Sequence, residues 1–388
     1  MLNKNILDFF KVIKKKIRSH TTLHKPLIDK DDCNYVNLSL KKGEVSTYGA
    51  NTELFEKKLA NFLGVKNVIA TINGTCALHA ILSYLNFNKS DEILVQTLTF
   101  VATVNPILYV GANPHFIDSS ESSLAADPNK LEEYLNSNKF KKKGGHLINI
   151  ATKRKIRALL ITHIYGYPAE IIKLKKVAKK FNLILIEDAA ETIGTKVNNK
   201  KLGTFGDYSF ISFNGNKTIT TGAGGAIICR KNINYKKLKH IVTTSKNKNS
   251  IIPDHDKLGF NYRMPSLNAS LGLSQLKKIN KILSAKLKIF EMYTMIVEKF
   301  NQEFKVYLSK NPKSQNNHWI VLLICKNTKI RNTLLYYAKR NKIQIKAVWK
   351  PMHKLEFLKK YPKMNLDVAN TLSNKIICLP SSPHILLR

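Results

Sequence analysis

The sequence of 388 residues has little of what marks several protein classes. Its five cysteines, at positions 33, 76, 229, 325 and 378, form no C-x-x-C pair, which argues against a zinc ribbon or a disulfide scaffold and fits a reducing compartment. With 17 Gly and 12 Pro it is no low-complexity linker. No apolar run reaches the roughly 18 residues of a membrane span. We therefore expect a cytoplasmic protein, and no metal site is predicted.

Acidic residues are also scarce: the chain has 26 Asp and Glu but 64 Lys and Arg, which gives a formal net charge of +38. Such an excess is compatible with a non-catalytic protein that binds nucleic acid or an acidic membrane surface. The lysines recur along the whole chain, as at Lys14–Lys16, Lys141–Lys143 and Lys277–Lys278, instead of forming one stripe between aromatics. This distribution favours a Lys-rich solvated surface and no nucleic-acid partner, although a positive field suits a diphosphate substrate.

Residues 1–22 form a basic extension in which apolar residues such as Ile6, Phe10 and Ile13 recur at helical spacing between lysines. One interpretation is an amphipathic helix that makes weak contact with anionic lipid. The other, which we favour, is an N-terminal helix docked on its own protein.

The remaining chain, 44% hydrophobic overall, alternates short apolar runs with helix-period segments up to about residue 250. Strands are expected at Asn67–Ile72, Glu92–Gln96, His115–Asp118, Arg157–His163, Leu183–Glu187, Tyr208–Phe213 and Gly225–Cys229. Alternation of this kind predicts an α/β fold with a mostly parallel, seven-stranded sheet. We place this large domain at residues 23–250. Residues 251–388, which begin with long helices from Pro265 to Phe300, are expected to form a smaller α+β domain, and the polar segment Ser245–Lys257 a mobile connection.

Three sequence segments contain candidate binding or catalytic residues. Asn73–His79 follows a strand and opens a helix, a geometry that binds anions, although Gly-Thr is also a common turn and N-cap. Glu187 and Asp188 end a buried strand, where ligands of open α/β sheets bind, although Asp188 alone could be a helix cap. Lys217 lies in a turn rich in Gly, Asn and Thr that matches no dinucleotide or Walker motif.

Together the clusters supply what pyridoxal phosphate needs. A lysine forms a Schiff base with its aldehyde, a carboxylate keeps its ring nitrogen protonated, and a helix N-terminus takes its phosphate. The combination therefore predicts pyridoxal phosphate as the cofactor.

These residues resemble the DegT/DnrJ/StrS family of nucleotide-sugar aminotransferases, and most closely its LegC-type subgroup. The resemblance covers roughly residues 25–385 and is carried, in order, by Gly43–Thr47, Asn73–His79, Thr97–Thr103, Glu187–Glu191, Ser212–Lys217 and Gly259–Met264. It implies an aspartate aminotransferase-like fold (fold type I) and a homodimer with shared sites.

The resemblance also implies residue roles. Lys217 would be the Schiff-base lysine and base, Asp188 the partner of the pyridine nitrogen, and Phe100 the ring that stacks on the cofactor. Gly74, Thr75 and Ser212 would bind its phosphate, with Asn261 reaching it from the neighbouring subunit. Glu191 stands near the cofactor's O3′ side, where relatives often carry Gln or His. His163 could line the site, but a satisfied core histidine is favoured, and Trp349, Lys350 and His353 are candidate substrate contacts.

The function implied is transfer of an amino group from L-glutamate to C4 of a nucleotide-linked 4-keto-6-deoxy sugar for surface glycans or nonulosonic acids. We expect a UDP-linked N-acetylhexosamine, with a GDP-linked perosamine-type substrate as the alternative. Related dehydratases carry His in place of the lysine, so Lys217 favours transamination. Ala223 departs from the family's Gly-rich turn, and because Ala disfavours positive φ the turn is expected to differ there.

Overall fold

The protein is described here by a computed structural model, in which residues 4–18, 21–247, 250–252 and 254–387 are placed. Its largest sheet runs in the order β1 (Val68–Thr71), β11 (Gly225–Cys229), β10 (Tyr208–Ser212), β7 (Ile184–Asp188), β6 (Lys155–Thr162), β2 (Asp91–Gln96), β3 (Asn113–Ile117). The strands from β10 to β3 are mutually parallel, and β11 is antiparallel to both its neighbours. The α/β class and the mostly parallel sheet are confirmed, but the sheet has nine strands, because two more join the seven that were predicted.

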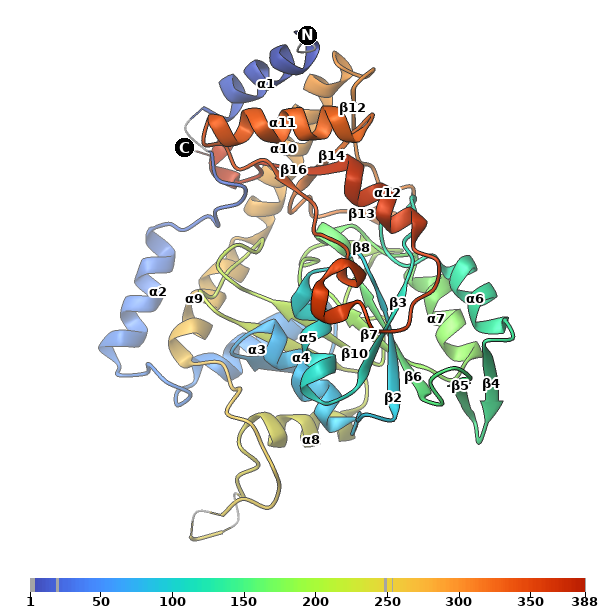
Figure 1. Cartoon of the computed structure of the whole chain (residues 1–388). Coiled ribbons are helices and arrows are strands. Elements are labelled where there is room, and N and C mark those ends of the chain that lie inside the picture. Colours follow the sequence, from blue (N-terminus) through green and yellow to red (C-terminus); the bar gives the residue numbers. More distant parts are fainter. Residues whose placement is uncertain (1–3, 19–20, 248–249, 253, 388) are drawn as a thin grey trace.

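Helices cover both faces of this sheet, as expected for strands that are apolar at consecutive positions (Figure 1). The connecting helices are α4 (Gly74–Tyr84), α5 (Val101–Tyr109), α6 (Pro128–Asn136), α7 (Ile171–Lys180) and α8 (Asn232–Val242). A hairpin of β4 (Phe140–Lys143) and β5 (His146–Asn149) extends the sheet beside β6, which the sequence did not predict. Helices α2 (Lys30–Lys41), α3 (Asn51–Leu63) and α9 (Ser266–Lys277) pack together next to it.

A second, antiparallel sheet lies toward the C-terminus. Its strands are β12 (Phe304–Val306), β14 (Val321–Cys325), β16 (Ile376–Leu379) and β15 (Lys346–Ala347), in that order, with α10 (Ile279–Glu298), α11 (Thr328–Arg340) and α12 (Asp367–Lys375) around them. A short sheet of β13 (Ser314–Gln315), β8 (Lys196–Val197) and β9 (Lys200–Lys201) joins this region to the large one.

Core packing bears on the domain limits at 22/23 and 250/251, which stay a prediction. Ala269 of α9 packs with Phe55 and Phe213 in the core of the large sheet. Ile289 and Tyr293, later in α10, instead pack with the small sheet. We therefore propose that the division between the two units falls within α10.

Helix α1 (Lys4–Ile17) docks on the chain's own C-terminal unit, beside α10 and α11 (Figure 1). Its apolar face is buried, with Phe9 and Ile13 at 0% exposure, and Phe9 stacks on Phe304 with ring centroids 4.2 Å apart. The face left to solvent is lysine-rich. The apolar face that a lipid-bound helix would need is therefore already packed against the protein, as the docking interpretation expected. Residues 1–3, 19 and 20 of the extension lie outside the described residues.

Within the part of the chain that the structure places, no helix combines the length and apolar character needed to cross a membrane. The segment Ser245–Lys257, predicted as a mobile connection, includes residues 248, 249 and 253, which are not described. On either side of them Lys246 and His255 form an isolated antiparallel bridge.

Candidate active site

Every residue to which the resemblance assigns a catalytic or cofactor-binding role, except Asn261, lines one cavity of about 600 Å³ at the carboxyl ends of the central strands. The predicted residues in its wall are Gly74, Thr75, Phe100, Asp188, Glu191, Ser212 and Lys217. Asn261 is exposed, pairs with Thr243 in an isolated bridge, and does not line the cavity of its own chain.

One end of the cavity, where an anion is predicted to bind, is formed where β1 leads into α4. Asn73 caps α4 by accepting the N–H of Cys76 at 2.7 Å, so Gly74 and Thr75 are the first helical residues. The first N–H groups of a helix have no partner inside it and carry the positive end of its dipole. A Cβ on Gly74 would lie 3.2 Å from Cβ of Ser212, at the end of β10, so this serine stands directly beside the helix start.

The turn that carries Lys217 depends on two glycines. Gly222 has a φ of 82°, and a Cβ on Gly224 would come within 1.9 Å of Oγ1 of Thr221. Ala223 is not among the described residues with positive φ. The left-handed position of the turn falls on Gly222, so Ala223 does not have to adopt positive φ, and a difference from the family's turn stays a prediction.

Asp188 ends β7 at 4% exposure inside a set of donors. Its Oδ2 accepts hydrogen bonds from the hydroxyls of Thr103, at 2.6 Å, and Thr162, at 3.3 Å, and its Oδ1 accepts the N–H of Ala190 at 3.1 Å. Burial raises the pKa of Asp188, and the bond from Thr103 and the charge of Lys217 oppose this shift. A cation placed against this carboxylate would stabilise its ionised form.

Lys217 and Glu191 form a buried ion pair, with Nζ 2.9 Å from Oε1 and side-chain exposures of 13% and 5%. The second oxygen of Glu191 accepts the N–H of Tyr165 at 2.7 Å, and Tyr165 has a φ of 53°, an unusual value for a bulky residue. Burial raises the pKa of Glu191, while Lys217 lowers it. The pair fixes the amine within the cavity.

Aromatic rings form the rest of the wall. The Trp319 ring centroid lies 4.3 Å from Nζ of Lys217, and its Nε1 donates to the carbonyl of Asn216 at 2.9 Å. Tyr165 stacks on Trp349 with centroids 4.4 Å apart, and Trp349 lies 5.9 Å from Phe100, which is 50% exposed. Of the three candidate substrate contacts near the C-terminus, only Trp349 lines the cavity.

His163 and Glu187, which adjoin the cavity, belong to the core. His163 is 0% exposed, its Nε2 lies 3.0 Å from Oε2 of Glu187, and its Nδ1 accepts the N–H of Ala169 at 3.1 Å. Glu187 also accepts three backbone N–H groups, from Gly203, Phe205 and Gly206. The favoured interpretation of His163 as a satisfied core histidine agrees with these contacts.

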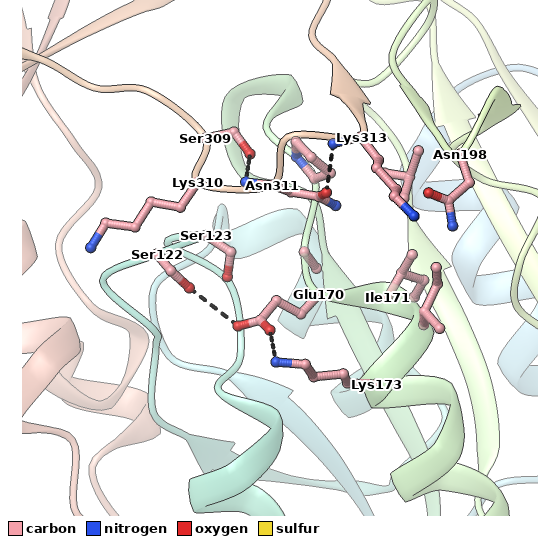
Figure 2. A pocket seen from close by; sticks show the side chains of 14 residues that line it. Ser122, Ser123, Glu170, Ile171, Lys173, Asn198, Ser309, Lys310, Asn311 and Lys313 are labelled. Atoms are coloured by element: carbon pink, nitrogen blue, oxygen red, sulfur yellow. Dashed lines mark hydrogen bonds and ion pairs between the residues drawn. The ribbon is translucent and has the colours of Figure 1, made fainter.

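A separate hollow of about 380 Å³ lies between the start of α7 and the segment 309–313 (Figure 2). Its acid, Glu170, is already paired: Lys173 lies 2.6 Å from one oxygen, and Ser122 donates to the other at 3.2 Å. None of the predicted site residues lies there.

Several residues of the wall carry no motif that sequence analysis could use. Tyr165, Trp319 and His24 all line the cavity, but each comes from a segment without a recognisable pattern. The only available signal was the rarity of tryptophan, since the chain has two, Trp319 and Trp349, and both line this cavity.

Comparison with known proteins gives the same assignment. Residues 26–387 match the DegT/DnrJ/EryC1/StrS aminotransferase family. A GDP-perosamine synthase of Vibrio cholerae is 33% identical over 369 residues, 94% of each chain. A UDP-4-amino-4,6-dideoxy-N-acetyl-β-L-altrosamine transaminase of Campylobacter jejuni (strain 81-176) is 30% identical over 86% of this chain and 84% of its own.

Solved structures agree on the fold. Helicobacter pylori PseC, an aminotransferase of pseudoaminic acid biosynthesis, superposes with a TM-score of 0.83 at 24% identity, covering 95% of both chains. A DegT/DnrJ/EryC1/StrS aminotransferase of Brucella abortus superposes with a TM-score of 0.80 at 25% identity, covering 91% of both chains. The chain belongs to the DegT/DnrJ/EryC1/StrS aminotransferase family and is a pyridoxal-phosphate-dependent aminotransferase.

Proposed function

We propose that this enzyme transfers the amino group of L-glutamate to C4 of a nucleotide-linked 4-keto-6-deoxyhexose. The observation that carries the proposal is that Lys217, Asp188 and the N-terminus of α4 meet in one cavity. Relatives whose names specify aminated 4,6-dideoxy sugar nucleotides support the acceptor. A Bacillus subtilis relative named as a spore coat polysaccharide biosynthesis protein, 28% identical, supports a role in surface glycans.

The residues present fit pyridoxal phosphate. Gly74, Thr75 and Ser212 would take the phosphate, and Asp188, whose ionised form is costly without a nearby cation, would face the ring nitrogen. When bound, the cofactor supplies an aldehyde that exchanges the amino group and a ring that withdraws electrons. Phe100, half exposed, would cover one face of the ring.

Lys217 would move the proton between the substrate carbon and the cofactor. Its Nζ already lies at the cavity wall, held by Glu191 at 2.9 Å and covered by the Trp319 ring. Lys217→Ala is therefore expected to abolish turnover and the absorption band of lysine-bound cofactor. Full activity in this variant would refute the proposal, whereas the matched change Lys201→Ala, on β9 and outside the cavity wall, should leave turnover unchanged.

For the nucleotide, we propose GDP first and UDP second. Relatives named GDP-perosamine synthase are 33%, 32% and 34% identical, against 30% and 29% for the two named UDP-altrosamine transaminases. This reverses the order expected from the sequence alone. GDP- and UDP-linked 4-keto-6-deoxy sugars, each incubated with L-glutamate, would decide by mass spectrometry of the aminated product. Turnover of UDP-linked acceptors alone would restore the first expectation.

We further propose a homodimer in which Asn261 completes the partner's cavity. The support is that Asn261 is exposed and lies outside its own cavity. Mixing Lys217→Ala chains with Asn261→Ala chains should then restore about a quarter of the wild-type activity, because half of the randomly paired dimers hold one intact site. Activity equal to the sum of the separate variants would contradict shared sites.

A further inference from the structure

His24, in the segment between α1 and α2, lines the catalytic cavity with an unused imidazole. Both ring nitrogens are shielded from solvent, and neither makes a hydrogen bond of good geometry to a described residue, although the backbone carbonyl of Asn216 lies near enough to act on the ring. A buried polar group without a partner is costly, and such groups in native proteins commonly await a ligand, an ion or water. His24 is therefore a candidate for contact with what fills the cavity.

The backbone on both sides of His24 is anchored, so the ring position is not left to a loose loop. The N–H of Leu23 donates to Oε1 of Gln344 at 3.1 Å, and its carbonyl accepts the N–H of Ser381 at 2.7 Å. On the other side, the N–H of Lys25 donates to Oγ of Ser382 at 2.9 Å. These bonds hold the segment against Gln344, which precedes β15, and against the residues that follow β16.

The imidazole lies in the same wall of the cavity as Trp319 and within electrostatic reach of Lys217. Its ring meets Trp319 edge-on, with centroids 6.2 Å apart and planes at 64°. Trp319 in turn lies over Nζ of Lys217, at 4.3 Å. A molecule that reaches Lys217 therefore comes close to His24.

The surroundings keep His24 neutral. Burial is the largest cause that lowers its pKa, well below 6.5, and the charges of Lys286 and Lys217 add to it. His384 also opposes a charge on His24, whereas a weak backbone hydrogen bond to the carbonyl of Asn216 favours one. A neutral imidazole offers one donor and one acceptor, which suits a hydroxyl group. The carboxylates of glutamate would instead be matched by a cation.

We propose that His24 is a substrate-binding residue that hydrogen-bonds to a hydroxyl of the acceptor sugar. The inference rests on the proposed function, since it requires a sugar as the amino acceptor. It assigns the N-terminal segment 21–25 to acceptor recognition, separate from the residues that hold the cofactor.

The test separates the two half-reactions by stopped-flow absorbance of the holoenzyme. The first step is driven by L-glutamate, and the second returns the cofactor to its lysine-bound form with a GDP- or UDP-linked 4-keto-6-deoxy sugar. His24→Phe keeps the size of the ring and removes its hydrogen bonds, whereas His24→Gln restores one donor and one acceptor. His146→Phe, in the β4–β5 hairpin, is the control for loss of a histidine.

We expect His24→Phe to slow the sugar half-reaction about tenfold at low sugar concentration through a higher KM, as for loss of one or two hydrogen bonds. The glutamate half-reaction should stay within about twofold, and His24→Gln should recover part of the loss, while the unfolding midpoint stays within a few degrees. Equal slowing of both half-reactions, or no slowing in His24→Phe, would overturn the assignment. A wild-type enzyme that completes the glutamate step but aminates none of the sugars would instead overturn the proposed function itself.

Discussion

The buried ion pair between Lys217 and Glu191 gives a quantitative prediction for the enzyme without cofactor. At 2.9 Å and an effective dielectric constant of about 20, the attraction is about 6 kcal/mol, and desolvation offsets part of it. Lys217→Met keeps most of the lysine's stem and removes its charge. Glu191 is then left buried without a cation, and it can respond only by taking up a proton.

The cost of protonating Glu191 sets the upper limit on the free energy of unfolding that Lys217→Met can lose. The usual pKa of Glu191 is 4.5, so holding it neutral in the folded state at pH 7 costs about 3 kcal/mol relative to the unfolded chain. Its folded pKa is already raised, and the variant should raise it further. A raised acid pKa means that the folded state binds the extra proton, so stability falls as pH rises above 4.5. Lys217→Met should therefore lose up to about 3 kcal/mol at pH 7, and less at pH 5.

Urea unfolding of the apoprotein, followed by tryptophan fluorescence, would measure this loss. The two tryptophans of the chain, Trp319 and Trp349, both line the cavity, so the signal reports on the site itself. The double variant Lys217→Met/Glu191→Gln removes the unpaired acid and should regain stability with a smaller pH dependence. If the two changes are additive within about 0.5 kcal/mol, the charges are not coupled and the reasoning fails.

Three further outcomes are expected. Gly225→Ala should weaken cofactor binding at least tenfold, because the new Cβ would lie 2.5 Å from the backbone of Asn73, just before α4. Gly215→Ala is the control, since its Cβ would have its nearest contact at 3.7 Å and should leave binding unchanged. Fluorescence titration with pyridoxal phosphate measures both. Thr103→Val should lower kcat several-fold by removing the 2.6 Å hydrogen bond to Asp188 and raising its pKa, which steady-state kinetics across pH would detect. Deleting residues 1–18 should lower the unfolding midpoint by several degrees in calorimetry, since it exposes the core beneath α1.

The sequence predicted those parts of the fold and site that depend on local patterns. Strands such as Leu183–Glu187 are apolar at consecutive positions, which marks a strand covered on both faces, and β7 occupies this stretch. Gly74 and Lys217 lie next to strand ends, where turn residues are recognisable. Because parallel strands end at one edge of a sheet, these local motifs could be placed together without knowing the packing.

The remainder depends on contacts between distant segments, which no local pattern encodes. His24, Tyr165 and Trp319 meet only because the C-terminal sheet folds back over the large one. Similarly, the amphipathic pattern around Phe9 predicts a helix with a buried face but cannot say whether lipid or protein covers it. Composition likewise identified the turn around Ala223 but not which residue takes positive φ, which is Gly222.

Lys286 explains how the two parts of the site keep their relative position. This side chain is fully buried in α10, and in the described part of the chain no carboxylate pairs with it. Its Nζ donates to the carbonyl of Trp319 at 2.8 Å and to that of Ser381. The N–H of Ser381 donates to the carbonyl of Leu23, next to His24, so one buried amine connects the ring beside Lys217 to the segment that we assign to acceptor binding. Burial lowers the pKa of Lys286, which reflects the free-energy cost of placing an amine in the core. The protein bears this cost at the point where the Lys286 side chain connects the two walls of the cavity.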